Sequence, residues 1–303
     1  MRMTVDLTDR RVALLGGDTR EVVLAYALAD AGANVVTCGF RRSFDHPRIC
    51  RVSGVIEAVT GAAGIIAPMT NTDENGRIKA VEDPDATLML DEAAFRAMEP
   101  GTPLFIGVAK PVIRHLAQRY KIRLIQSSEV DSIAILNSIP TAEGAIQLAM
   151  ERLPVTIHQS AAAVIGFGRC GITLARMLHA LGADTLVLAR RAAQQARAEE
   201  MGLKTAPWSD LPAALSDREV IFNTVPALVL NRSVLQQLRR DCVIIDIASE
   251  PGGVDFAAAD QLGIKAYLEL GLPGRVAPLT AGRILARTIP AMLAEMLEES
   301  ERG

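Results

Sequence analysis

Two stretches of the chain share one pattern of apolar and polar positions. An apolar run ends in a glycine at Val12–Gly16 and again at Ala163–Gly166. Apolar residues at helical spacing follow each run and lead to a second glycine, Gly32 or Gly182, and a second apolar run. Because the glycines have the same spacing in both halves, the two stretches form one repeated unit. The pattern predicts strand, tight turn, helix and strand, twice.

Further apolar runs supply more strands for each half of the chain. Each is short, and most lead into polar or small residues, as strands of a buried parallel sheet do. These runs are Ile65–Thr70, Leu104–Gly107 and Leu124–Ser128 in the first half, and Val220–Phe222 and Val243–Ile245 in the second. The chain therefore predicts two parallel sheets.

The length of 303 residues suits two domains. Asn137–Gly144 leads into a helical run, Ala145–Arg152, and a last helix is expected over Thr280–Glu298. A domain, a helix across, a second domain and a helix back is the architecture of D-2-hydroxyacid dehydrogenases and their relatives. We expect an α/β protein with two Rossmann-like doubly wound domains and an active site in the interdomain cleft. The expected domains are residues 1–138 with 282–303, and residues 139–281.

Composition narrows the range of partners. Half of the residues are hydrophobic, 22% are charged and 4% are aromatic, a balance typical of helix-covered parallel sheets. The net charge is −3, and no basic run alternates with aromatics, so we expect no nucleic-acid partner. Met1–Arg11 is polar where a signal peptide needs an apolar core, and no stretch has the length of a membrane span. We expect a cytoplasmic protein that does not bind a membrane.

The four cysteines give little support to a metal site or a disulfide. They are Cys38, Cys50, Cys170 and Cys242, without a C-x-x-C pair or a histidine at metal-ligand spacing. A cluster that only the fold assembles stays open as an alternative. Cys38 and Cys242 lie in apolar runs and are expected to be small buried residues.

Only the second copy of the repeated unit keeps three glycines of a dinucleotide fingerprint. Gly166 suits the tight turn, Gly168 lets the backbone approach a pyrophosphate, and Gly171 allows close helix packing. The first copy has Asp18 and Glu21 at the corresponding positions, and their carboxylates repel a pyrophosphate. A glycine-rich turn without a function is the alternative, but the strand before and the helix after it favour a cofactor site. The other loop residues expected beside the cofactor are Phe167, Arg169 and Cys170.

The end of the second strand of this unit indicates which dinucleotide binds. NAD-binding proteins place an acidic residue there for the ribose 2′-hydroxyl, whereas this chain has Ala189, Arg190 and Arg191. Two guanidinium groups suit a 2′-phosphate, so the sequence favours NADP. The alternative is that both arginines are merely solvated at a helix start.

Polar residues follow two more strands of the second half. Asn223 and Thr224 end one apolar run, and Asp246 and Ser249 end the next. Ligands of open α/β sheets gather at such strand ends, although helix capping is an equal alternative for each residue alone. Pro251–Gly253 and Gly271–Gly274 are expected as turns, either beside the cofactor or merely reversing the chain. The predicted cofactor contacts here are Asn223, Thr224, Val225, Pro226, Ala248, Gly271 and Pro273.

Six stretches together resemble one protein family over nearly the whole chain. The most specific are Asp246–Phe256 and Gly271–Gly282. The others are Val12–Asp18, Asn137–Gly144, Val164–Gly171 and Asn223–Pro226. With these motifs the chain resembles the A subunit of dipicolinate synthase. It departs from the expected pattern at Glu250, where a basic residue is expected.

The resemblance implies an activity and partners. It implies oxidation of dihydrodipicolinate to dipicolinate (pyridine-2,6-dicarboxylate), with hydride passing to NADP⁺ as the ring becomes aromatic. It also implies a separate flavoprotein-like B subunit, and a role in sporulation, in the mother cell of a spore-forming bacterium. A homo-oligomer is expected.

Candidate residues for this reaction follow from the resemblance and from the strand ends. A planar dicarboxylate needs donors at two ends, which hydroxyls, bare backbone and arginines provide. All four histidines lie outside the shared motifs, so Glu143 and Asp246 are the predicted acid–base or polarising residues. The predicted substrate-binding residues are Thr70, Ser127, Thr141, Ser249 and Pro278.

Two other functions remain open from the sequence. A D-2-hydroxyacid dehydrogenase needs an arginine and an acid-paired histidine in the cofactor domain. Here His158 precedes the first strand of that domain and His179 lies inside its first helix, which disfavours this class. The other alternative is an NADP-binding scaffold subunit without chemistry of its own, because no base is evident.

Overall fold

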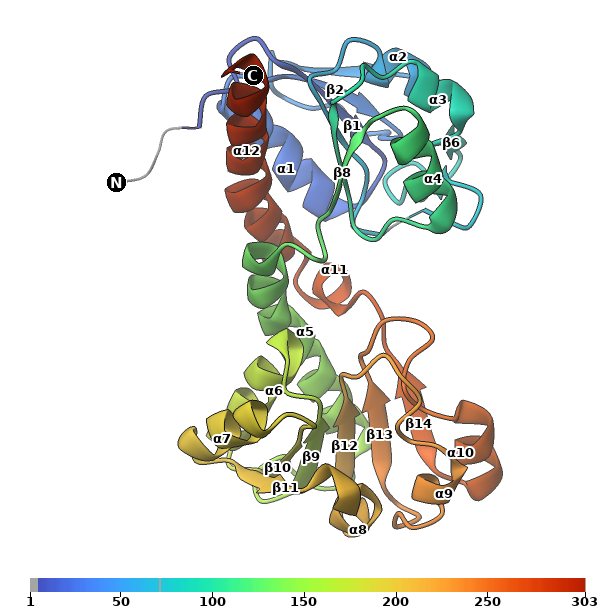
Figure 1. Cartoon of the computed structure of the whole chain (residues 1–303), viewed down its shortest axis with the longest axis vertical. Helices are drawn as coiled ribbons and strands as arrows, with labels where there is room; N and C mark the ends of the chain where they lie inside the picture. Colours follow the sequence, from blue (N-terminus) through green and yellow to red (C-terminus); the bar gives the residue numbers. More distant parts are fainter. Residues whose placement is uncertain (1–4, 71, 303) are drawn as a thin grey trace. The chain divides into compact units, whose positions relative to one another are not determined.

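The chain folds into two compact units. In the computed structural model, residues 5–70 and 72–302 are described (Figure 1). The first unit contains the chain up to Leu136 and from Ala277, and the second contains Asn137–Val276. Asn137 and Ser138 thus belong to the second unit and residues 277–281 to the first, unlike the expected division. Residues 1–4 of the amino-terminal stretch that was compared with a signal peptide, and residue 303, lie outside the described residues.

The first unit is built on a doubly wound parallel sheet. Within the described residues the sheet has six strands, in the order β3-β2-β1-β4-β7-β8, and all its pairings are parallel. The fold class expected from the sequence is therefore confirmed for this half. The strands are β1 (Arg11–Leu15), β2 (Asn34–Cys38), β3 (Ile49–Val52), β4 (Gly64–Ile66), β7 (Pro103–Ile106) and β8 (Arg123–Gln126). A short antiparallel pair, β5 (Arg77–Ile78) and β6 (Leu88–Met89), lies outside this sheet.

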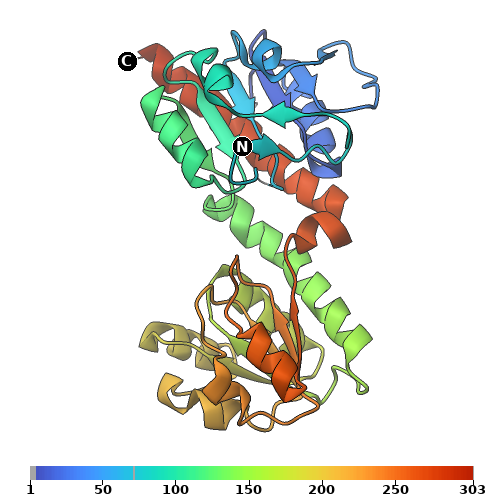
Figure 2. The same cartoon turned by 90° about the vertical axis from the view of Figure 1, so that its right-hand side faces the viewer.

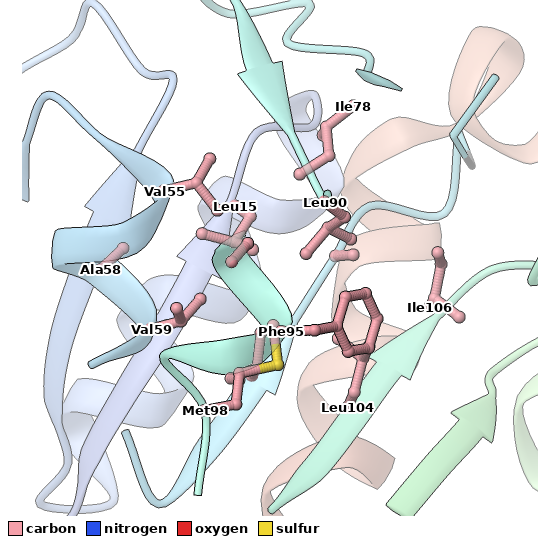
Figure 3. Packing of buried hydrophobic residues seen from close by; sticks show 14 of the residues in the cluster. Leu15, Val55, Ala58, Val59, Ile78, Leu90, Phe95, Met98, Leu104 and Ile106 are labelled. Atoms are coloured by element: carbon pink, nitrogen blue, oxygen red, sulfur yellow. The ribbon is translucent and has the colours of Figure 1, made fainter. Parts of the chain in front are cut away.

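Helices cover both faces of the first sheet because its strands are apolar on both sides. Val12 and Leu14 of β1 pack in the cluster with the first and last helices, whereas Leu15 packs on the other face with Val59 and Phe95 (Figure 3). Such two-sided burial is what a parallel sheet requires. The helices are α1 (Thr19–Asp30), α2 (Val55–Val59), α3 (Glu92–Arg96), α4 (Pro111–Arg119) and α12 (Pro278–Arg302).

The second unit repeats the same plan. Its described residues form a six-stranded parallel sheet in the order β11-β10-β9-β12-β13-β14, and Figure 1 labels these strands. Figure 2 gives a second view of this unit, coloured from green to orange. The strands are β9 (Ala161–Ile165), β10 (Asp184–Leu188), β11 (Lys204–Ala206), β12 (Val220–Asn223), β13 (Val243–Asp246) and β14 (Lys265–Leu268). The helices are α5 (Asp131–Arg152), whose residues up to Leu136 belong to the first unit, α6 (Arg169–Ala180), α7 (Ala192–Glu200), α8 (Leu211–Leu215), α9 (Arg232–Leu235), α10 (Phe256–Leu262) and α11 (Leu272–Val276), with a 3-10 turn at Trp208–Asp210.

Two segments that were not predicted to be helical lie in helices. Asn137–Gly144 lies inside α5, which begins at Asp131 and continues through Pro140. Apolar residues on both sides of Pro140 hold this helix by packing, so one proline does not end it. Leu272 begins α11 instead of belonging to a turn, because its side chain packs against Gly144 of α5. Among the described helices, none is both long and apolar enough to span a membrane.

The last helix is fixed to the first unit by a close approach at Gly282. A Cβ atom there would lie 2.8 Å from Cβ of Val23 and 3.1 Å from the backbone of Arg20. Leu285, Ile289 and Leu293 of α12 are buried in the same cluster as α1. A glycine is therefore required where α12 crosses α1.

We predict that Gly282→Ala destabilises the first unit. The added methyl meets backbone atoms that cannot rotate away, which outweighs the better helix propensity of alanine. The free energy of unfolding should fall by about 1–2 kcal/mol in urea denaturation. Gly54→Ala is the control, because a Cβ there meets nothing within 4 Å. Equal stability of both variants would contradict the packing argument.

Candidate functional site

A cavity of ≈ 450 Å³ opens in the second unit, at the carboxyl ends of β9, β10, β12 and β13. Figure 1 labels these four strands. Ligands of doubly wound sheets bind at this edge. The wall contains most of the residues predicted to bind the cofactor, and also Ser249, which was predicted to bind substrate. It is formed by Gly166–Cys170, Ala189–Arg191, Thr224–Pro226 and Ile247–Ser249, with Gln194 and Trp208.

The three fingerprint glycines have distinct places around this wall. Gly166 adopts a φ of +92°, which glycine tolerates best, and so turns the chain sharply after β9. Gly171 lies inside α6, where a Cβ would overlap the carbonyl oxygen of Gly166. Gly168 precedes α6, and a Cβ there would meet nothing within 4 Å. The glycines thus bring the start of α6 against the end of β9 and leave open space above Gly168.

The amino end of α6 is suited to an anion. No side chain within the described chain caps it at Gly168, so the N–H groups of its first turn are directed toward the cavity edge. Arg169, Arg190 and Arg191 contribute to the wall, and none of the described lining residues is acidic. The helix dipole and these cations therefore act in the same direction. The thiol of Cys170 stays protonated, since burial raises its pKa.

The two arginines after β10 are available to a ligand. Both are exposed, and within the described residues neither forms an ion pair. The guanidinium carbon of Arg190 lies 6.0 Å from the centre of the Trp208 ring. Gln194 donates a hydrogen bond of 3.0 Å to the carbonyl of Phe167 and so joins α7 to the glycine turn. The wall at this end is cationic and partly aromatic.

Asn223 and Asp246 form the buried support of the cavity floor. Both side chains are fully buried, and Nδ2 of Asn223 donates to Oδ1 of Asp246 at 2.8 Å. Asp246 also accepts hydrogen bonds from the backbone N–H of Ala248 (3.0 Å) and of Gly253 (2.6 Å). Because three donors already occupy this carboxylate, the geometry favours a positioning role over the acid–base or polarising role predicted for it. Neither residue caps a helix, so that alternative is wrong for both.

The buried side chains of Asn223 and Asp246 explain why glycines occupy positions 252 and 253. A Cβ on Gly252, whose φ is +83°, would lie 2.6 Å from Oδ2 of Asp246. A Cβ on Gly253 would overlap the side-chain amide of Asn223. The pair therefore fits the loop around buried polar groups, and neither glycine belongs to the cavity wall.

Five other predicted residues of the second unit lie outside the cavity wall. Gly271 directly precedes α11 and Pro273 is its second residue, and Thr141 of α5 donates its hydroxyl to the carbonyl of Asn137 at 2.7 Å. Glu143 is exposed on α5 and stays a prediction as an acid–base residue. Gly171 acts behind the wall through its contact with Gly166.

The remaining predicted substrate residues lie in the first unit. Thr70 follows β4 and lines a different cavity, which belongs to that unit. Ser127 is buried at the end of β8, where its N–H donates to the carbonyl of Ile106. Pro278 is the first residue of α12. The structure thus places Thr70, Ser127 and Pro278 in one unit, and Thr141 and Ser249 in the other.

In the first unit, the chain itself covers the corresponding glycine turn. The N–H of Gly17 donates to the carbonyl of Lys79, and the N–H of Val81 donates back to Gly17. Past β2, Arg41 pairs with Asp83, and Arg42 pairs with Glu82. Carboxylates of the segment 79–85 thus meet Arg41, which corresponds to Arg191 in the repeat, and its neighbour Arg42.

The carboxylates of Asp18 and Glu21 accept hydrogen bonds from backbone N–H groups at the start of α1, which an anion bound there would need. Asp18 accepts from the N–H of Arg20 and pairs with its guanidinium at 2.8 Å, while Glu21 accepts from the N–H of Asp18 and of Met69. Burial raises the pKa of Glu21 to about 7, against the opposing charge of Arg20. These contacts support the interpretation that the first half is not a dinucleotide site.

Three residues of the cavity wall were missed from the sequence. Gln194 and Trp208 follow β10 in the chain, and Ile247 stands between the predicted residues Asp246 and Ala248. Trp208 is the only tryptophan in the chain, a signal that could have drawn attention to it.

Cys38 and Cys242 are buried, as expected, and burial raises the pKa of their thiols to about 11 and about 12. Across residues 5–70 and 72–302, no cluster of side chains is suited to a metal ion.

The fold and cavity define a Rossmann-type dehydrogenase domain that binds a nicotinamide dinucleotide. In agreement, residues 140–252 match the family model for the D-isomer specific 2-hydroxyacid dehydrogenase, NAD binding domain. The apo structure of D-lactate dehydrogenase from Escherichia coli has the same overall fold, with a TM-score of 0.59 at 14% identity, covering 96% of this chain and 97% of that one.

The first unit and the chain as a whole identify the family. Residues 11–127 match the family model for the N-terminal domain of the dipicolinate synthase A subunit. The chain is 38% identical to the A subunit of dipicolinate synthase from Bacillus subtilis, over 97% of this chain and 99% of that protein. The crystal structure of the corresponding A subunit from Bacillus halodurans has a TM-score of 0.91 at 35% identity, covering 95% and 99% of the two chains. The chain belongs to the family of dipicolinate synthase A subunits.

We predict that Asp246→Ala destabilises the second unit. Removing the carboxylate leaves the N–H groups of Ala248 and Gly253, and one of the two N–H bonds of the Asn223 amide, without an acceptor. The free energy of unfolding should fall by about 3 kcal/mol in chemical denaturation. Asp260→Ala, at an exposed position of α10, should change it by less than about 0.5 kcal/mol. An Asp246→Ala variant as stable as this control would rule out the support role.

Proposed function

We propose that the chain is the NADP-dependent subunit of an enzyme that oxidises dihydrodipicolinate to dipicolinate. A flavoprotein-like B subunit is the partner in this proposal, and the setting is the mother cell of a sporulating bacterium. Family membership supports the substrate and the partner. A homo-oligomer of the chain belongs to the same proposal.

The observation that carries the NADP assignment is the charge of the cavity wall. Arg190 and Arg191 stand at the end of β10, where an NAD-binding domain places a carboxylate. A 2′-phosphate would be held by these guanidinium groups, and a pyrophosphate by the turn at Gly166–Gly168 and the start of α6. The open space above Gly168 fits this, since a Cβ there would project into it unopposed by protein.

The other end of the wall would hold the nicotinamide half. Thr224 is fixed by the hydrogen bond of its hydroxyl to the carbonyl of Ile165 at 2.9 Å. Asp246 accepts a hydrogen bond from the backbone N–H of Ala248 and so holds this residue in place. The chain thereby presents a pre-formed surface at the strand ends, and orientation of two reactants on such a surface lowers the barrier.

The proposed reaction depends more on how the two rings are positioned than on a strong base. When bound, the oxidised nicotinamide ring accepts a hydride. The dihydropyridine ring loses that hydride and one proton, and it becomes aromatic. Because aromatisation is strongly favourable, residues that exclude water and align the rings can account for most of the contribution of this chain.

We predict that the double variant Arg190→Ala and Arg191→Ala loses its preference for NADP⁺. Each guanidinium contributes a charge-assisted hydrogen bond to a 2′-phosphate, so NADP⁺ binding should weaken on the order of 100-fold. Binding of NAD⁺ should change little. Isothermal titration calorimetry of both cofactors measures this.

Arg197→Ala is the matched control for this pair. Arg197 lies on the same helix, α7, but pairs with Glu200 and does not line the cavity. It should leave both affinities unchanged. An equal loss of NADP⁺ and NAD⁺ binding in the double variant would refute the 2′-phosphate assignment.

We predict that the reaction needs both subunits and reduces NADP⁺. The chain, the B subunit, NADP⁺ and dihydrodipicolinate together should form dipicolinate and NADPH in equal amounts, followed by their absorbance. The chain alone should show little turnover. Dipicolinate formed without NADPH would instead assign this chain a scaffold role.

A further inference from the structure

A second cavity, of ≈ 570 Å³, lies wholly within the first unit. Two segments form it: the chain after β4, with Thr70, Thr72 and Asp73, and the chain from Arg77 onward through β5. It shares no residue with the dinucleotide cavity, which belongs to the second unit. The dinucleotide assignment therefore leaves this cavity unexplained.

The charge of this cavity is positive. Arg77 and Lys79 line it, and within the described residues neither side chain forms an ion pair. Asp73 is the acidic residue among the described lining residues, and its Oδ1 accepts from the backbone N–H groups of Asn75 and Arg77. Asp83, outside the lining, pairs with Arg41. Two basic residues against one acidic residue give the described lining a net positive charge, which favours an anionic ligand.

Two hydroxyl groups in the wall are unsatisfied. Oγ1 of Thr70 and Oγ1 of Thr72 are buried, and within the described chain neither has a hydrogen-bond partner. Thr72 is only 5% exposed. Buried hydroxyls without partners are rare in folded proteins, because each loses its hydrogen bonds to water. Both are donors that a carboxylate oxygen could accept from.

The rest of the wall is apolar. It includes Ile78, Ala80, Val81 and Pro84, which suit the faces of a flat ring. A ring with a carboxylate at each of two ends matches this combination of cations, hydroxyl donors and apolar surface.

We infer that this cavity of the first unit binds a planar ring dicarboxylate, with Arg77, Lys79 and the hydroxyl of Thr72 as its ligands. The proposed function supplies the identity of the ligand, which is the substrate or product of that reaction. The location and the anionic character rest on the cavity itself.

Titration calorimetry of the full chain with dipicolinate in metal-free buffer tests the inference. Arg77→Ala and Lys79→Ala should each weaken binding about 10-fold or more, because each loses a charge-assisted hydrogen bond. Arg96→Ala removes an exposed arginine of the same unit that does not line the cavity, and it should bind as the unchanged chain does. No binding by the unchanged chain, or equal binding by all variants, would overturn the inference.

Thr72→Val separates a ligand role from a folding role. Since the hydroxyl has no protein partner within the described chain, the variant should keep the melting temperature while dipicolinate binding weakens. Unchanged binding, or a lower melting temperature, overturns the role of Thr72. Picolinate, with one carboxylate, should bind more weakly than dipicolinate. Inorganic phosphate that binds as tightly as dipicolinate overturns the dicarboxylate class.

Titration of the same variants with NADP⁺ distinguishes this inference from the proposed function. NADP⁺ affinity should be equal in all of them, because the two cavities share no residue. If NADP⁺ fails to bind while dipicolinate binding depends on Arg77 and Lys79, the proposed function fails and the dicarboxylate cavity stands. If NADP⁺ binds but dipicolinate does not depend on these residues, the inference alone fails.

Discussion

The close approach of α6 to the end of β9 is the constraint on which the second unit depends. Gly171 permits it, because any side chain there would overlap the carbonyl oxygen of Gly166. The approach puts the first turn of α6 at the mouth of the sheet edge, where unsatisfied N–H groups and the helix dipole face a ligand. The cavity, its cationic wall and the buried support beneath it are arranged around this one contact.

The first unit shows what the same fold becomes when that constraint is absent. Glu21 stands where Gly171 stands in the repeat, and its carboxylate turns back to accept from the backbone of Asp18 and Met69. The helix end is then satisfied by the chain itself, and the segment 79–85 packs over the glycine turn. The first copy of the fold forms a different cavity, whose wall contains cations and hydroxyl groups in place of a glycine-rich turn.

Much of the fold was predictable because its signals are local. Glycine after an apolar run, apolar residues at helical spacing and a second run are properties of neighbouring residues, and both sheets formed as predicted. The helical course of Asn137–Gly144 was not predictable in this way. Pro140 and Gly144 each disfavour a helix, and the packing of Gly144 against Leu272 comes from a part of the chain far away in sequence.

The sequence by itself determined the repeated α/β units, the family and most of the cofactor cavity wall, because these depend on residue type and on spacing within one βαβ unit. Only the tertiary structure decided that Asp246 is a buried support, that Trp208 and Gln194 complete the wall, and that Thr70 belongs to a separate cavity. The reason is physical: burial and hydrogen-bond satisfaction depend on which distant segments meet, and a linear pattern does not specify those meetings.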